Sequence, residues 1–167
     1  MIWRLGNLWD QAPAAFWLLL AACLYLLVVA ARLAVIDIRS HLLPNRIVLP
    51  SYAVAGVLLL GACWASADGG AALRVAVGAA ALWVFYFVIR FIHPPGLGYG
   101  DVKLAGVLGM YLGYTGLSGL LWATMAAFLL GGLWGVLLVA ARRGSLKSAI
   151  PFGPFMLLGA VGVLAVG

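Results

Sequence analysis

The sequence contains no glutamate, and aspartate supplies all four of its acidic residues. Charged residues of both signs make up only 8% of the chain, whereas soluble domains typically carry about 25%. With 66% hydrophobic residues and a mean hydropathy of +1.17, the chain has too few polar side chains to cover a water-exposed surface. These shortages exclude an ordinary soluble domain and indicate an integral membrane protein.

Cysteine and histidine are also scarce, with two residues of each. Cys23 and Cys63 lie inside apolar runs without CxxC spacing, so we expect neither a disulfide nor a zinc site. His41 and His93 are too few to predict a metal centre, and we expect no metal or cofactor. The net charge of +6 comes from basic residues scattered at the ends of apolar runs, where they meet lipid headgroups. We therefore expect the lipid bilayer, and no nucleic acid, as a partner.

Apolar runs of about 20 residues, enough for a helix to cross about 30 Å of hydrocarbon, predict an all-α polytopic membrane protein. All 167 residues are expected to form one transmembrane domain, with the first apolar segment retained and not cleaved as a signal peptide. Six transmembrane helices are expected, at about residues 14–36, 46–65, 71–92, 102–112, 117–141 and 150–167. The fourth offers only about 17 Å before glycines 113 and 116 interrupt it, so we expect it to be short or re-entrant.

Basic residues gather on one side of these expected helices. The smaller group is Arg4 and Arg74. The larger group has eight members, namely Arg32, Arg39, Arg46, Arg90, Lys103, Arg142, Arg143 and Lys147. Because Lys and Arg accumulate on the cytoplasmic side, we expect both termini outside the cytoplasmic membrane. This topology places Asp37 and Asp101 together at the cytoplasmic side.

Asp37 and Asp101 are the candidate catalytic residues, although 64 residues separate them in the sequence. Two carboxylates close together in a partly dehydrated site do not both ionise easily, so one keeps a proton while the other acts as a base. Aspartic peptidases use such a pair to activate water and to protonate the leaving amine. Around Asp101, Gly98 and Gly100 would let a substrate backbone approach closely. Lys103 would reach the membrane interface, or else tune Asp101 or contact substrate.

Three motifs extend this interpretation: DIRSHLLPNRIVLP from Asp37, GYGDVKLAG from Gly98 and IPFGPF from Ile150. In this order they resemble the type IV prepilin peptidase family, the membrane aspartic peptidases with a GxGD motif. The resemblance covers roughly residues 34–155. It implies that Asp37 and Asp101 are the catalytic pair of a prokaryotic inner-membrane enzyme. The implied substrates are prepilins, pseudopilins or preflagellins, whose short basic leader is cut at the cytoplasmic face, just before a hydrophobic stem.

The sequence departs from the commonest pattern of that family at two places. Many bacterial members carry an additional amino-terminal region with paired cysteines and also methylate the new amino terminus. Only thirteen residues precede the first expected helix here, so the chain resembles a minimal peptidase form and methyltransferase activity is not expected. The second departure is Asn45, which stands in LPN where LPD is frequent.

Two other functions were weighed against this interpretation. GLSG at residues 116–119 resembles the GxSG motif of rhomboid serine proteases, but Ser118 is expected on the outer face, far from His41 and His93. In a small membrane transport or assembly subunit, Asp37 and Asp101 would instead handle protons or a cation. That function would require polar residues continuing across the membrane, and the expected helix interiors offer almost none. The oligomeric state is left open.

Overall fold

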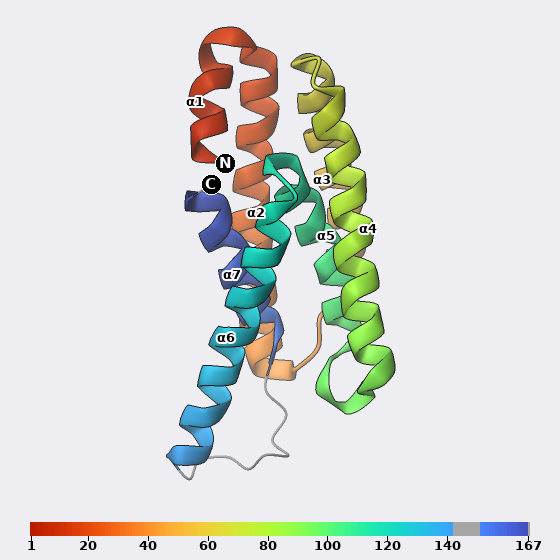
Figure 1. Ribbon diagram of the computed structural model, residues 1–167, viewed down its shortest axis with the longest axis vertical. Coiled ribbons are helices and arrows are strands. Elements are labelled where there is room, and N and C mark those ends of the chain that lie inside the picture. The colour runs from red at the N-terminus through yellow and green to blue at the C-terminus, as the bar shows by residue number, and fades with distance from the viewer. Residues whose placement is uncertain (142–150, 167) are drawn as a thin grey trace.

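The structure is a computed structural model that describes residues 1–141 and 151–166. These residues form a bundle of seven α-helices with one short 3-10 helix, η1 (Figure 1). The elements in chain order are α1 (Ile2–Gln11), α2 (Pro13–Ser40), α3 (Asn45–Ala65), α4 (Gly69–Ile92), η1 (Pro94–Gly96), α5 (Tyr99–Thr115), α6 (Ser118–Ala140) and α7 (Gly153–Val166).

Four of the helices, α2, α3, α4 and α6, are long and apolar enough to cross a membrane. Large apolar side chains such as Val57, Leu73 and Leu121 point outward, 67% to 72% exposed, which suits contact with lipid. The chain is therefore an all-α polytopic membrane protein, as predicted. With 17 and 14 residues, α5 and α7 are shorter than these four helices.

The central helix of the bundle is α5, the element that was expected to be interrupted. Apart from Lys103, every residue from Asp101 to Tyr114 is buried. The expected interruption at glycines 113 and 116 was wrong for Gly113, through which the helix continues to Thr115, and correct for Gly116, where it ends with a φ of 155°. At 1.5 Å per residue, 17 residues extend for about 26 Å.

Glycines explain why α5 continues, because they let its backbone touch that of α4. A Cβ atom on Gly78 of α4 would collide with the carbonyl oxygen of Gly109, and one on Gly109 would collide with the carbonyl oxygen of Gly78. A Cβ atom on Gly113 would collide with the carbonyl oxygen of Arg74. Small residues commonly permit such close helix contacts in membranes. The contact holds α5 against α4 and so sets the position of the α5 amino terminus.

Several helix ends differ from the sequence expectations. The helix expected to end near residue 36 continues to Ser40 and closes at His41, so Asp37 lies inside its last turn. The expected start of the last helix at Ile150 lies outside the described residues, and α7 begins at Gly153. The first helix, α1, was not predicted, because its ten residues are too few to register as an apolar membrane-length run.

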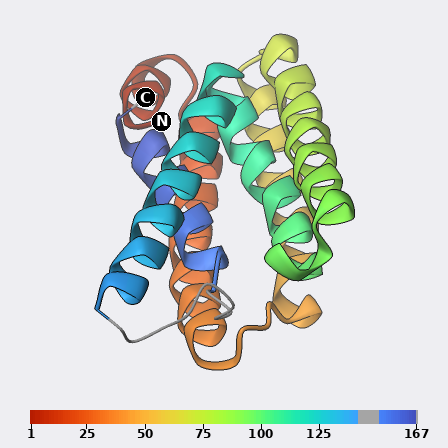
Figure 2. The same cartoon turned by 60° about the horizontal axis from the view of Figure 1, so that its bottom comes forward.

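The bundle has two ends that matter for function. We call the end where α2 and α4 finish and α5 and α7 begin the site end, which lies at the bottom in Figure 1 and comes forward in Figure 2. The opposite end contains the turn of residues 66–68 between α3 and α4, and we call it the Asp68 end. Short connections thus bring sequence-distant segments together at the site end.

Candidate active site

Asp37 occupies the last turn of α2 and is only 5% exposed. Its Oδ2 accepts a hydrogen bond of 3.0 Å from the backbone N–H of Gly153, the first residue of α7. An aspartate near the carboxyl end of its own helix is electrostatically disfavoured, whereas the amino end of α7 offers unpaired N–H groups and partial positive charge. A Cβ atom on Gly153 would lie 2.7 Å from Asp37 Oδ2. The start of α7 is therefore shaped around this carboxylate.

Asp101 occupies the first turn of α5 and is 6% exposed. Its Oδ2 accepts a 3.0 Å hydrogen bond from the N–H of Gly98, while its own N–H donates to the Gly98 carbonyl oxygen at 3.2 Å. This reciprocal pairing resembles a helix capping box and gives Asp101 a structural role. Capping alone does not require burial, however, and aspartate is rarely buried without a partner. Helix capping therefore does not explain why Asp101 is buried.

Leu43, in the connection between α2 and α3, joins the surroundings of the two carboxylates. A Cβ atom on Gly100 would lie 2.7 Å from Leu43 Cβ, and a Cβ atom on Gly153 would lie 3.5 Å from Leu43 Cδ1. The neighbours of Asp101 and Asp37 thus pack against the same side chain. Both aspartates are buried at the site end, one in the last turn of α2 and the other in the first turn of α5. The structure brings together the two aspartates that the sequence singled out.

Arg90 supports the loop that leads to Asp101. Its guanidinium donates to the carbonyl oxygen of Pro94 at 3.0 Å and also to that of Leu97, and its Cζ lies 5.7 Å from the centre of the Tyr99 ring. From the sequence, Arg90 was expected only as one of the basic residues that orient the helices in the membrane. The available signal was its place in the last turn of α4 just before two prolines, where basic side chains often bind free carbonyl groups.

Lys103 lies at the edge of the candidate site. Its Nζ donates to Asn45 Oδ1 at 2.9 Å and lies 5.0 Å from the centre of the Tyr99 ring. These contacts tie α5 to the start of α3. A role for Lys103 toward Asp101 or substrate stays a prediction.

The two glycines beside Asp101 have a packing role in addition to the predicted one. A Cβ atom on Gly98 would lie 3.1 Å from Asp101 Oδ2, and Gly100 packs closely on Leu43. Substitution at either position would therefore disturb the site even without substrate. The predicted role of Gly98 and Gly100, to let a substrate backbone approach Asp101 closely, stays a prediction.

The serine-protease alternative fails on geometry. Ser118 begins α6 at the opposite end of the bundle from His41, which follows α2, and His93, which follows α4 (Figure 1). A nucleophile and its base need hydrogen-bond contact, which this separation excludes. Within residues 1–141 and 151–166, no three side chains of metal-binding type gather into a cluster.

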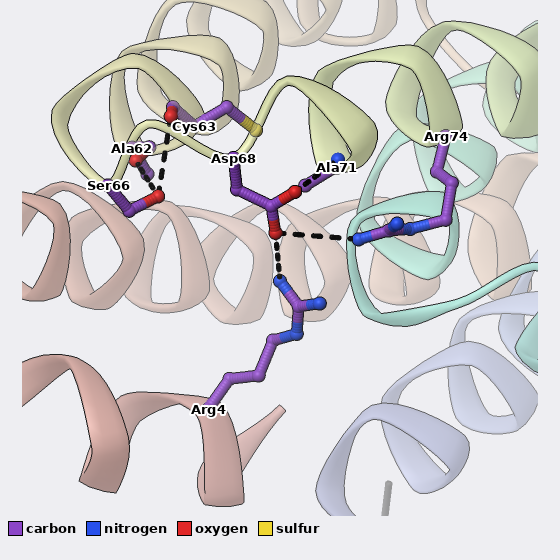
Figure 3. A network of polar contacts seen from close by, with 7 residues as sticks. All are labelled: Arg4, Ala62, Cys63, Ser66, Asp68, Ala71 and Arg74. Carbon is purple, nitrogen blue, oxygen red and sulfur yellow. Dashed lines mark hydrogen bonds and ion pairs between the residues drawn. The ribbon is translucent and has the colours of Figure 1, made fainter.

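Asp68 provides a contrast at the other end (Figure 3). Its Oδ1 accepts the Ala71 N–H at 2.8 Å, and its Oδ2 lies 3.4 Å from Arg4 Nη1 and 3.6 Å from Arg74 Nη2. The amide of Ala71, joined by the two arginines, holds the pKa of Asp68 below its usual range. Arg4 and Arg74, which were expected on one side of the membrane, both contact Asp68 at this end of the bundle. Of the opposing basic group, Arg142, Arg143 and Lys147 lie outside the described residues.

Comparison with known proteins places this geometry in context. Residues 14–139 match the type IV leader peptidase family. The chain is similar to proteins named prepilin leader peptidase/N-methyltransferase. The one from Pseudomonas putida is 34% identical over 125 residues, which are 74% of this chain and 42% of the relative. Relatives from Aeromonas salmonicida and Burkholderia pseudomallei are 33% and 34% identical, covering 84% and 93% of this chain and 47% of each relative. The chain thus spans less than half the length of these relatives. No solved structure matches it.

Proposed function

Because the chain belongs to the type IV leader peptidase family, we propose that it is an aspartic endopeptidase that cleaves the leader peptide of prepilins, pseudopilins or preflagellins. The catalytic residues in this proposal are Asp37 and Asp101. One observation carries the assignment: Asp37 of α2 and Asp101 of α5 are both buried at the site end, within the residues that match the family, and the glycine beside each of them packs on Leu43. The relatives' names supply the substrate class.

The proposed mechanism follows from a shared proton. With one carboxylate ionised and the other protonated, the ionised group removes a proton from water as the water oxygen attacks the scissile carbonyl. The protonated group donates a hydrogen bond to the carbonyl oxygen as negative charge develops there. Collapse of the tetrahedral intermediate breaks the C–N bond, and a proton passes to the leaving amine. No metal or cofactor takes part in this scheme.

The proposed membrane arrangement uses the two ends of the bundle. We place the site end in the cytoplasm, because Arg39, Arg90 and Lys103 gather there, and the Asp68 end outside. In this scheme, α5 and α7 complete six crossings with α2, α3, α4 and α6, as one domain in the inner membrane. Both described chain ends then lie in the outer half (Figure 1).

The transport alternative receives less support from the described residues. The buried polar or charged side chains among them are Asp37, Ser51 and Asp101. Ser51 is occupied locally, since it donates to the Ile47 carbonyl oxygen at 2.8 Å and lies 3.1 Å from Tyr25 Oη. Proton or cation relay would need a series of polar groups across the bundle. We therefore favour the peptidase.

The decisive experiment is cleavage of a co-reconstituted prepilin by wild type, Asp37→Asn and Asp101→Asn, with Asp68→Asn as the matched control. Each site variant should lose cleavage by about 10³-fold, within the range for removal of a general acid or base. The control should remain active. Full cleavage by either site variant would contradict the mechanism. Mass spectrometry of the product also separates cleavage from methylation, the second activity in the relatives' names.

A further inference from the structure

An apolar groove of about 540 Å³ runs between α4 and α6. It arises because α4 packs mainly on α5 while α6 packs mainly on α7, so that α4 and α6 diverge (Figure 2). Thr124 is the one polar side chain among the residues that line it. The lining residues used below are Ala81 and Phe85 of α4, and Leu121, Thr124, Met125 and Phe128 of α6.

One end of this groove meets the candidate active site. The ring of Phe128 lies 5.1 Å from that of Phe152 and 6.0 Å from that of Tyr86, between ring centres. Phe152 directly precedes Gly153, whose N–H donates to Asp37 Oδ2 at 3.0 Å. The aromatic cluster of Tyr86, Phe128 and Phe152 therefore connects the groove to the segment that binds Asp37.

We propose that the α4–α6 groove binds the apolar helical segment that follows the scissile bond of the substrate. The inference rests on the proposed peptidase function and deepens it. From Leu120 to Leu129 the α6 wall extends for about 14 Å, which matches two to three turns of a bound helix. A helix seated there would direct its preceding, extended residues toward Asp37 and Asp101.

The chemistry of the groove selects this part of the substrate. A charged leader would lose its hydration in an apolar groove without gaining a partner, whereas an apolar helix already in the bilayer loses none. Ala81 is small enough to let a helix approach α4 closely. Lipid tails or a second copy of the chain would also contact apolar side chains, but neither would use the connection to the carboxylates.

A kinetic experiment tests the proposal with two substrates: a full prepilin, and a leader peptide that ends shortly after the scissile bond. Ala81→Trp fills the groove, and Ala80→Trp is the matched control, because Ala80 is exposed on the same helix but does not line the groove. We expect Ala81→Trp to raise KM for the full prepilin at least tenfold more than for the short peptide. Ala80→Trp should have the same KM as wild type for each of the two substrates.

Crosslinking supplies a second readout that does not depend on turnover. A photoreactive phenylalanine at Leu121 should crosslink to the apolar segment of the prepilin, and one at Leu133 should not, since Leu133 is 58% exposed on α6 outside the groove. Crosslinks from position 121 only to lipid or to a second copy would overturn the proposal. Equal effects of Ala81→Trp on both substrates would also overturn it. If wild type cleaves neither substrate, the proposed function itself fails, which distinguishes the two failures.

Discussion

The two ends of the bundle hold aspartates in opposite ways. At the Asp68 end, the side chain is 36% exposed and has a backbone N–H and two arginines as partners. At the site end, Asp37 and Asp101 are buried, and each accepts one backbone N–H. The ion pairs among the described residues all involve Asp68. Abundant positive partners suit a carboxylate that stays ionised and stabilises the fold, whereas buried carboxylates near each other suit proton exchange.

Apart from substitution of the two aspartates themselves, the largest expected effect comes from placing a side chain where the site end leaves no room for one. Gly153→Ala should reduce kcat/KM by at least about 100-fold, because its Cβ atom would displace the Asp37 carboxylate, and small misplacements of catalytic groups cost about that much. Gly162→Ala on the same helix is the control, since a Cβ atom there meets nothing within 4 Å. Cleavage assays check both. Equal activity of the two variants would remove Gly153 from the site.

The next effect compares two arginines of α4, one at each end. Arg90→Met should lower kcat about tenfold, because it releases the carbonyl groups of Pro94 and Leu97 that position the loop before Asp101. Arg74→Met breaks an ion pair with Asp68 and should leave kcat near that of wild type. Single-turnover cleavage with saturating enzyme measures this difference. A larger loss in Arg74→Met would reverse the comparison.

Substitutions at the Asp68 end should change the stability of the fold. Asp68→Ala is expected to lower the free energy of unfolding by about 1–2 kcal/mol, from the lost helix cap and exposed ion pairs. Asp68→Asn should lose less, because asparagine is also a good cap. Denaturation in detergent measures both values, and leader cleavage should persist in each. Loss of cleavage in well-folded Asp68→Asn would break the division between the two ends.

The lowered pKa of Asp68 predicts a small pH effect. A carboxylate with a depressed folded-state pKa contributes stability above its unfolded pKa of about 3.9, and this contribution is lost as pH falls through the folded value. Wild type should therefore lose slightly more thermal stability than Asp68→Asn on acidification below about pH 4. The other three carboxylates are common to both proteins, so the difference isolates Asp68. Parallel acid profiles would contradict the prediction.

The smallest effect comes from adding an ion pair to the site end. Asn45→Asp would convert the hydrogen bond with Lys103 into an exposed ion pair, worth less than about 1 kcal/mol. Thermal denaturation should show a slight gain that disappears in high salt. Cleavage should change less than twofold. A large change in cleavage would show that Lys103 acts on Asp101 and not only on α3.

The features that depend on local sequence pattern were predictable from the sequence alone. Apolar runs located α2, α3, α4 and α6 within a few residues, and the scarcity of carboxylates reduced the candidate pair to Asp37 and Asp101. A long apolar run reports membrane crossing regardless of neighbouring helices, and a rare charge in such a chain is conspicuous. The four long helices and the candidate pair could therefore be predicted without the structure.

Other features depend on contacts between distant segments. The Gly153–Asp37 hydrogen bond joins residues 116 positions apart, and no local pattern encodes that distance. Gly113 was interpreted as a break because a helical glycine is intrinsically unfavourable, whereas its tertiary contact with α4 outweighs that cost. In each case the sequence does not reveal which segment of the backbone packs against the residue.

The glycine contact between α4 and α5 has a mechanical consequence. Because the backbones touch at Gly78 and Gly109, no compressible side-chain layer separates α4 from α5 there, and we expect the two helices to move together. Widening the space between Asp37 and Asp101 then means displacing α4 and α5 relative to α2 and α7. One wall of the groove is formed by α4, and Asp101 lies on α5. A substrate helix that displaces α4 should therefore also displace Asp101.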